Sequence, residues 1–282
     1  MIAVPSTVGV IGGGRMGAGI AQVFAQAGAH VTVIERDPAA VEAASTRLAD
    51  GIRKAAERDA SVDVDAIAGR LAASANYEAL RNAALVIEAV PETFALKVEA
   101  MQRAEGIVEE SAWLVTNTSS LAVTRLAAQL ARPERVCGLH FFNPVPSSSL
   151  VEIVLTPSTD PALREQAEQW VKVLGKTPIV VNDAPGFASS RLGAAIALEA
   201  MRMLEEGVAS AEDIDTAMVL GYRHATGPLR TSDLVGLDVR LGIAEYLQDT
   251  LGERFAPPQI LRDKVAAGEL GRKTGRGFFD YS

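Results

Sequence analysis

The stretch TVGVIGGGRMG, residues 7–17, decides the expected fold of the first part of the chain. Its β-branched beginning predicts a strand, and a G-x-G-x-x-G pattern follows directly and opens a predicted helix. In that setting Gly12 makes the tight turn, Gly14 lets a pyrophosphate approach the backbone, and Gly17 allows helix and strand to pack closely. The stretch therefore predicts a dinucleotide-binding turn. The residues assigned to it are Gly12, Gly14, Arg15, Met16 and Gly17.

An acidic residue ends the second predicted strand. Glu35 comes 18 residues after Gly17, where a carboxylate can accept hydrogen bonds from both hydroxyls of an adenine ribose. The same carboxylate repels a 2′-phosphate, so the sequence favours NAD over NADP. Arg36 follows and can bind such a phosphate, which leaves the strictness of that preference open.

Alternating patterns through the first two-thirds of the chain predict strands joined by crossover helices, as in a parallel sheet. Helix-period stretches alone continue after Pro185, so we expect a sheet domain over residues 1–184 and an all-helical domain over residues 185–282. The predicted strands are Thr7–Ile11, His30–Glu35, Leu85–Ala89, Trp113–Asn117, Val136–His140, Val151–Leu155 and Thr177–Val181. The predicted helices include Met16–Ala27, Ala95–Glu110, Ala188–Glu206, Ala211–Leu220, Val239–Leu251 and Pro258–Ala267.

Composition excludes several classes of function. The 282 residues carry 27 Lys+Arg against 35 Asp+Glu, a net charge of −8, which argues against nucleic-acid and anionic-membrane partners. No signal-peptide pattern and no run of about 18 apolar residues is present, so we expect a cytoplasmic protein without a membrane span. The single cysteine, Cys137, lies on a predicted buried strand, and no Cys/His spacing predicts a metal.

A nicotinamide enzyme that oxidises an alcohol needs a base, and histidine has a suitable pKa near neutrality. The chain has three histidines. His30 begins a strand expected to be buried, and His224 lies in a loop of the helical domain. His140 ends a strand at the carboxyl edge of the sheet, where ligands of open α/β sheets bind. We therefore expect His140 to be the general base.

Glu152 is a carboxylate inside an otherwise apolar strand, where burial is costly unless the charge is paired. Pairing with His140 would remove that cost, fix the ring tautomer and stabilise the imidazolium. The alternative is a strand-end histidine and an edge-strand glutamate that never meet. A third strand is followed by Asn117-Thr118-Ser119-Ser120, whose hydroxyls can hold a substrate oxygen or simply cap a helix over Leu121–Leu130.

With these residues assembled, the chain resembles the 3-hydroxyacyl-CoA dehydrogenase family, particularly the short bacterial 3-hydroxybutyryl-CoA type. The resemblance covers nearly the whole chain, and its most specific part is the segment Gly138–Pro146. Its other motifs are Gly12–Ala21, Ala89–Glu92, Asn117–Leu121, Pro185–Phe187, Gly227–Asp238 and Gly271–Phe278.

The resemblance implies a Rossmann-like, doubly wound domain, a helical dimerisation domain, and reversible NAD-dependent oxidation of an L-3-hydroxyacyl-CoA. It implies that His140 is the base, Glu152 its partner and Ser119 a donor to the substrate oxygen. Glu92, Lys97 and Asn143 match positions that contact the nicotinamide half of the cofactor. Read without the resemblance, Lys97 is a solvated surface charge.

Two positions depart from the family pattern. Ser190 stands where the family usually has an asparagine that helps to hold the substrate oxygen, and a hydroxyl keeps one donor with a shorter reach. The segment Ser147-Ser148-Ser149 replaces larger apolar and basic residues, which leaves the preferred acyl chain open.

An acidic protein still needs local positive charge to bind coenzyme A. Arg53, Lys54 and Arg58 fall on or near one face of a predicted helix and supply a candidate patch, although such a face is usually only solvated. The apolar helices of the second domain suit an isologous homodimer. Two alternatives stay open: a dehydrogenase of the same fold for a free hydroxy acid, of the gulonate or carnitine type, and a non-catalytic NAD-binding protein.

Overall fold

The chain forms two compact units in the computed structural model, which describes residues 3–281. One unit ends at Asp183 and the other begins at Ala184. Each unit has a hydrophobic core of its own. Within the described residues, no helix is long and apolar enough to cross a membrane.

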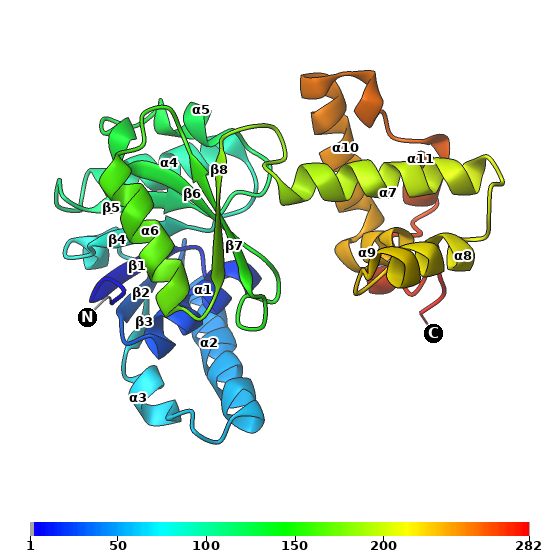
Figure 1. The fold of residues 1–282 in the computed structure, drawn as a ribbon. Helices are drawn as coiled ribbons and strands as arrows, with labels where there is room; N and C mark the ends of the chain where they lie inside the picture. The colour runs from blue at the N-terminus through cyan, green and yellow to red at the C-terminus, as the bar shows by residue number, and fades with distance from the viewer. Residues whose placement is uncertain (1–2, 282) are drawn as a thin grey trace. The chain divides into compact units, whose positions relative to one another are not determined.

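The first unit is built on one eight-stranded sheet with the spatial order β3-β2-β1-β4-β5-β6-β7-β8 (Figure 1). Neighbours from β3 to β6 are parallel, β6 and β7 are antiparallel, and β7 and β8 are parallel. The strand order reverses at β1 and β4, the kind of point where open α/β sheets bind ligands. The strands are β1 (Thr7–Ile11), β2 (His30–Ile34), β3 (Leu71–Ser74), β4 (Leu85–Glu88), β5 (Trp113–Thr116), β6 (Val136–Phe141), β7 (Leu150–Leu155) and β8 (Thr177–Asn182).

Helices cover the sheet and supply its two apolar layers. The helices α1, α2 and α6 share one core with the strand residues that point to their side. Helices α4 and α5 contact β4, β5 and β6. The helices of this unit are α1 (Arg15–Gln26), α2 (Pro38–Arg58), α3 (Val64–Ala68), α4 (Phe94–Glu105), α5 (Val123–Ala127) and α6 (Pro161–Val173).

The seven strands expected from the sequence are confirmed to within one residue at each end. The eighth, β3, was missed because its sequence, LAAS, has no β-branched residue and is mostly half-buried at the sheet edge. The expected helix Ala95–Glu110 is too long, since α4 ends at Glu105 with Gly106 as its C-cap. His30 is exposed at the start of β2, and the strand that it begins is mostly buried, as expected.

The second unit is helical and packs around its own core (Figure 1). The expected helix Ala211–Leu220 ends earlier, and a π-helical turn, Ala217–Gly221, follows it. Pro228 occupies the first turn of α9, where its missing N–H costs nothing. The helices are α7 (Ser189–Glu205), α8 (Ala211–Thr216), α9 (Pro228–Val235), α10 (Leu237–Leu251) and α11 (Gln259–Ala266).

Two buried carboxylates join the segments of this helical unit. Asp215 in α8 accepts hydrogen bonds from the N–H groups of Leu229 at 2.8 Å and Arg230 at 2.9 Å, and so caps α9 from another helix. Asp233 in α9 accepts from three groups of the C-terminal tail, at 2.9, 2.9 and 3.1 Å. These donors are the Phe278 and Phe279 N–H groups and the Tyr281 hydroxyl.

We predict that Asp215→Ala destabilises the helical unit by about 1–3 kcal/mol, because two buried N–H groups lose their acceptor. Urea unfolding followed by far-UV circular dichroism measures the change. The control is Asp249→Ala on the exposed side of α10, which we expect to change stability by less than about 0.5 kcal/mol. Equal stability of the two variants would contradict the capping role.

Candidate active site

The glycine turn after β1 contains close approaches that a side chain would block. Gly12 has a φ of +96°, a conformation that favours glycine. A Cβ at Gly17 would lie 1.8 Å from the carbonyl oxygen of Gly12, so only glycine fits where α1 meets the strand. No atom lies within 4 Å of the position that a Cβ of Gly14 would take. This open side lets a pyrophosphate approach the backbone.

The N-terminus of α1 has no side-chain cap. Gly14 is its N-cap, no side chain caps it, and its first turn contains no acidic residue. Its N–H donors and positive dipole end can therefore serve a bound anion. Arg15 is exposed beside this turn, and Met16 packs against the core. The turn thus fits the pyrophosphate of a dinucleotide.

The carboxylate of Glu35 is held at the same turn. Its Oε1 accepts a hydrogen bond from the N–H of Gly13 at 2.7 Å. Arg36 directs its guanidinium to Asp37, at 3.0 Å, and its side chain is 85% exposed. A carboxylate at this point accepts ribose hydroxyls and repels a 2′-phosphate, so the site suits NAD.

His140 and Glu152 are brought together by the reversal of strand direction. They are directly opposite each other in the antiparallel register of β6 and β7. Nδ1 of His140 lies 2.7 Å from Oε2 of Glu152, and the side chains are 8% and 0% exposed. The hydrogen bond assigns the Nδ1 proton to the Glu152 side, so the neutral ring carries its basic lone pair on Nε2. The alternative in which the two residues never meet is wrong.

Two neighbours fix the surroundings of the imidazole. The ring of Phe142 lies against that of His140, with centroids 4.4 Å apart. The side-chain oxygen of Asn117 accepts a hydrogen bond from the N–H of Phe141 at 2.9 Å. Asn117 therefore ties the loop after β5 to the end of β6, a contact that the sequence analysis did not assign.

Glu92 organises the hydroxyl-bearing loop after β5. Its Oε1 accepts from the Thr118 hydroxyl at 2.6 Å and from the Ser119 N–H at 2.8 Å. The Ser119 hydroxyl and both donors of Ser120 lie 3.1–3.2 Å from the same oxygen. The loop does not cap the following helix, because α5 begins at Val123 without a side-chain cap. Ser119 is thus placed by a carboxylate.

Lys97 is buried rather than solvated, with a side chain 1% exposed. Its Nζ lies 2.9 Å from Oε1 of Glu88 and 3.1 Å from Oε2 of Glu92. Glu88, also 1% exposed, accepts from the Thr116 hydroxyl at 2.5 Å. The Lys97 ammonium therefore joins the Glu88 carboxylate, at the end of β4, to the Glu92 carboxylate, which holds the loop with Ser119. The sequence analysis missed Glu88, since a glutamate at a strand end has no distinctive local pattern.

The charge of Glu92 depends on these contacts. Burial raises the pKa of the Glu92 carboxyl, but the Lys97 charge and the hydrogen bonds from Thr118 and Ser119 outweigh it and hold that pKa below its usual value. Glu92 is consequently a carboxylate at neutral pH that accepts hydrogen bonds.

Two further residues were expected at the site, Asn143 and Ser190. Asn143 is exposed in the turn after β6. Ser190 belongs to the second unit, where it lies in the first turn of α7. Its joint contact with His140 on one substrate stays a prediction.

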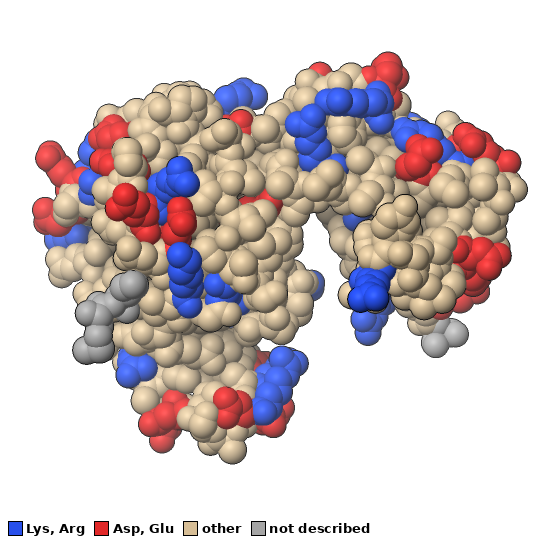
Figure 2. All heavy atoms as spheres, viewed as in Figure 1, with Lys and Arg blue, Asp and Glu red and all other residues tan. Residues whose placement is uncertain are grey.

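The expected coenzyme A patch is exposed on α2. Arg53 pairs with Asp50 at 2.7 Å, and Lys54 and Arg58 lie nearby on the same helix. Figure 2 shows basic and acidic side chains interspersed on the face in view, without a large area of a single sign. The patch is therefore a local feature, and its role stays a prediction.

Two further basic residues near the site were missed. Lys176, 7% exposed, donates to the carbonyl oxygens of Val145 and Ser148, both at 2.6 Å, and so holds the loop after His140. Arg47 donates to the carbonyl oxygen of Gly13 at 3.2 Å. The hydrogen bonds of Lys176 and Arg47 join segments that are distant in sequence. A single lysine or arginine forms no sequence pattern from which such contacts could be predicted.

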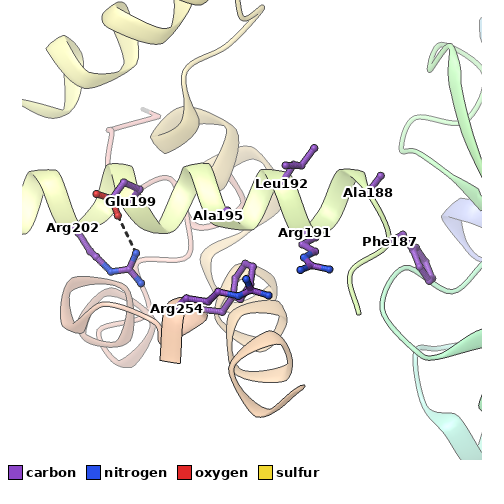
Figure 3. Close-up of a pocket in the computed structure, with 9 residues that line it drawn as sticks. Phe187, Ala188, Arg191, Leu192, Ala195, Glu199, Arg202 and Arg254 are labelled. Atoms are coloured by element: carbon purple, nitrogen blue, oxygen red, sulfur yellow. Dashed lines mark hydrogen bonds and ion pairs between the residues drawn. The ribbon is translucent and has the colours of Figure 1, made fainter. Parts of the chain in front are cut away.

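A cavity of about 370 Å³ lies along one side of α7 in the second unit. Figure 3 shows Arg191 and Arg202 projecting from the same side of that helix, with Arg254 approaching them. Arg202 is already bound to Glu199 at 3.2 Å and to the carbonyl oxygen of Ala256 at 2.9 Å. The cavity is a second basic region in an acidic protein.

Cys137 is fully buried in β6, as expected, and burial raises the pKa of its thiol. It is therefore a protonated core residue. Across residues 3–281, no group of three or more His, Cys, Asp and Glu side chains is arranged to hold a metal ion.

Comparison with known proteins places the whole chain in one set of relatives. A model of the NAD-binding domain of 3-hydroxyacyl-CoA dehydrogenase matches residues 7–184, and a model of its C-terminal domain matches residues 186–281. The chain is 42% identical to a probable 3-hydroxybutyryl-CoA dehydrogenase of Bacillus subtilis over 277 residues, which cover 96% of each chain.

Solved structures agree with these matches. The crystal structure of (S)-3-hydroxybutyryl-CoA dehydrogenase PaaH1 from Ralstonia eutropha is similar with a TM-score of 0.94 and 39% identity, covering 99% of each chain. That of Mycobacterium tuberculosis FadB2 is similar with a TM-score of 0.93 and 41% identity, covering 99% of this chain and 100% of the other.

We predict that Glu92→Gln destabilises the first unit at pH 7 and that the difference from wild type shrinks at acidic pH. The folded-state pKa of Glu92 is below its usual value of 4.5. Its stabilisation is therefore complete above that value and is lost as the pH falls through the folded-state pKa. Urea unfolding at pH 7 and at about pH 4 tests this. The control is Glu99→Gln, at an exposed position of α4. The prediction would be contradicted if the difference in free energy of unfolding between wild type and Glu92→Gln grew as the pH was lowered.

Proposed function

Because this chain belongs to the 3-hydroxyacyl-CoA dehydrogenase family, we propose that His140 and Glu152 serve the reversible NAD-dependent oxidation of an L-3-hydroxyacyl-CoA to the 3-ketoacyl-CoA. A short substrate such as 3-hydroxybutyryl-CoA is the first choice, since several relatives are named for it. The observation that carries the proposal is the 2.7 Å contact between His140 and buried Glu152.

In the oxidation, Nε2 of His140 takes the proton of the 3-hydroxyl group. The ring becomes an imidazolium whose Nδ1–H already points to the carboxylate of Glu152, which stabilises the new charge. NAD, when bound, accepts the hydride that leaves C3. In the reverse direction the imidazolium returns its proton to the developing alkoxide.

Substrate and cofactor are held by the residues around this pair. The hydroxyl of Ser119 donates to the substrate oxygen, and Ser190 donates to it from the helical unit. Glu92, Lys97 and Asn143 serve the nicotinamide half of the cofactor. Glu92 also keeps Ser119 in place through the hydrogen bond that it accepts from the Ser119 N–H, which remains when the Ser119 hydroxyl turns from Glu92 to the substrate oxygen.

The phosphates of coenzyme A are proposed to meet Arg53, Lys54 and Arg58. All three are exposed and cationic, as flexible phosphate contacts require. The overall acidity of the chain then favours these small anionic ligands over polymeric ones.

We also propose that the chain forms a homodimer through its helical unit. Most of the large apolar side chains that are exposed among the described residues belong to the helical unit. Burying them in an isologous contact between two copies is favourable. They are Leu192, Ile196, Val208, Leu220, Tyr222, Leu234, Val235 and Val239.

We place this reaction in the cytoplasm, where thiols stay reduced. The buried, protonated thiol of Cys137 is compatible with that setting.

We predict that His140→Gln abolishes turnover of acetoacetyl-CoA with NADH, lowering kcat by about 10²–10⁴-fold, because the general acid and base is lost. NADH binding, followed by fluorescence, stays at the wild-type level. Glu152→Gln lowers kcat by a similar order because the ring tautomer changes. His30→Gln, at an exposed strand end, is the matched control with unchanged kcat.

Full activity of His140→Gln would refute the assignment of the base. Turnover of free hydroxy acids in preference to acyl-CoA esters would refute the substrate class. NADH binding without turnover of any hydroxyacyl substrate would indicate a non-catalytic protein.

We predict that Leu220→Asp weakens the dimer at least about tenfold, since it places a charge in a desolvated contact. Leu220 is 76% exposed, so the folded subunit tolerates the change. Sedimentation velocity across a concentration series measures the dissociation constant. Val64→Asp, 40% exposed in the first unit, is the control. A monomeric wild type, or an unchanged dimer in the Leu220 variant, would contradict the proposal.

A further inference from the structure

Lys176 is a buried lysine whose ammonium contacts a single loop of the first unit. The residue is 7% exposed, and its Nζ donates to the carbonyl oxygens of Val145 and Ser148, both at 2.6 Å. Burial alone shifts the pKa of this ammonium, which it lowers, and no carboxylate among the described residues offsets that effect. Two carbonyl dipoles therefore hold the charge, whereas the ammonium of Lys97 meets two carboxylates.

The backbone of Lys176 is held independently of its side chain. Gly175 ends the turn after α6 with a φ of +71°, and the N–H of Lys176 donates to the carbonyl oxygen of Val171 at 3.1 Å. The N–H of Thr177, the first residue of β8, donates to the carbonyl oxygen of Ser149 at 2.6 Å. None of these bonds uses the ammonium, so its loss affects the loop and leaves the pairing of β7 with β8 in place.

The loop bound by Lys176 joins β6 to β7 and comprises residues 142–149, which we call the β6–β7 loop. The carbonyl oxygen of Pro144 accepts hydrogen bonds from the N–H groups of Ser147 and Ser148, at 3.1 and 2.9 Å. The proline ring also restricts the backbone at this residue. The middle of the loop is therefore a closed turn that moves as one piece.

The same turn is also packed against α1, the helix whose N-terminus forms the glycine turn. Val145 is 2% exposed. A Cβ built on Gly19 of α1 would lie 2.9 Å from the Cβ of Val145, so no space remains between helix and loop. Lys176 binds the carbonyl oxygen of Val145, and the residue is thus held from both sides.

The beginning of the loop carries groups that lie next to the base. The ring of Phe142 lies against that of His140, with centroids 4.4 Å apart. Asn143 follows and is exposed, and only Pro144 separates it from Val145. A displacement of Val145 is therefore passed on to Asn143 and Phe142 through a short, restricted stretch of backbone.

We propose that Lys176 is a positioning residue for the oxidation. By binding the carbonyl oxygens of Val145 and Ser148, it keeps Phe142 against the His140 ring and Asn143 at the nicotinamide. This inference rests on the proposed function, in which His140 is the base and Asn143 serves the cofactor. An ammonium suits the task because its hydrogen bonds are charge-assisted and it has enough donors for two carbonyl groups.

The test removes the ammonium and keeps the stem of the side chain, in Lys176→Met. We expect kcat for acetoacetyl-CoA with NADH to fall by about 10- to 100-fold, because the base and the nicotinamide are no longer aligned. The dissociation constant of NADH, measured by fluorescence, changes by less than about threefold, since the glycine turn and Glu35 are untouched. Hydrogen–deuterium exchange becomes faster in peptides that cover the β6–β7 loop. The matched control is Lys172→Met, at an exposed position of α6, which keeps the wild-type kcat and loop exchange.

A second variant displaces the loop from the other side and keeps the lysine. Gly19→Ala places a methyl group where the Cβ of Val145 is only 2.9 Å away, so the loop has to shift. Alanine is favoured over glycine in a helix interior, and the variant therefore does not depend on how the buried position 176 tolerates methionine. We expect the same pattern, a fall in kcat of at least about threefold with faster exchange of the loop.

Four results would overturn the inference. The first is an unchanged kcat in Lys176→Met and Gly19→Ala. The second is wild-type exchange of the β6–β7 loop in Lys176→Met. The third is faster exchange throughout the first unit of that variant, which would assign the lysine to the fold. The fourth is a rise in the dissociation constant of NADH as large as the fall in kcat, which would assign it to cofactor binding.

Failure of the proposed function gives a different result. If wild type turned over no CoA ester, the proposed function would be contradicted, and the role of Lys176 in this oxidation with it. If wild type is active and neither variant changes kcat, the proposed function stands and the inference about Lys176 alone is refuted.

Discussion

The pairing of His140 with Glu152, on which the proposed chemistry rests, depends on the antiparallel pairing of β6 with β7. In a sheet whose preceding strands are all parallel, this reversal sets His140 directly opposite Glu152. A buried carboxylate without a partner costs several kcal/mol, so the pair stabilises the strand register while it orients the imidazole. A slip of one residue would move either side chain to the other face of the sheet. The register of β6 and β7 therefore determines both the stability of the buried pair and the orientation of the His140 ring.

A second set of buried charges positions the other half of the site. Lys97 joins Glu88, at the end of β4, to Glu92, and Glu92 accepts the hydrogen bonds that shape the loop with Ser119. The ammonium keeps Glu92 ionised, and the ionised carboxylate in turn holds the serine. In the helical unit the buried Nε of Arg240 has no hydrogen-bond acceptor among the described residues.

Much of the fold followed from local patterns, and the errors have local causes as well. The strands with β-branched residues were predicted closely, whereas β3 lacks them and depends on pairing with β2. Lys97 was read as a solvated charge because its sequence position does not reveal that two carboxylates surround it.

By itself, the sequence determined the glycine turn, the acidic residue that follows it, and the order of strands and helices, and it selected His140 as the proposed base. These features rest on backbone sterics and side-chain periodicity over a few residues, which a linear pattern records. Only the tertiary structure decided that His140 meets Glu152, that Glu92 holds Ser119, and that Asp233 binds the C-terminal tail. Each of these contacts joins segments far apart in the chain. Their distances follow from strand register and helix packing, which no local pattern contains.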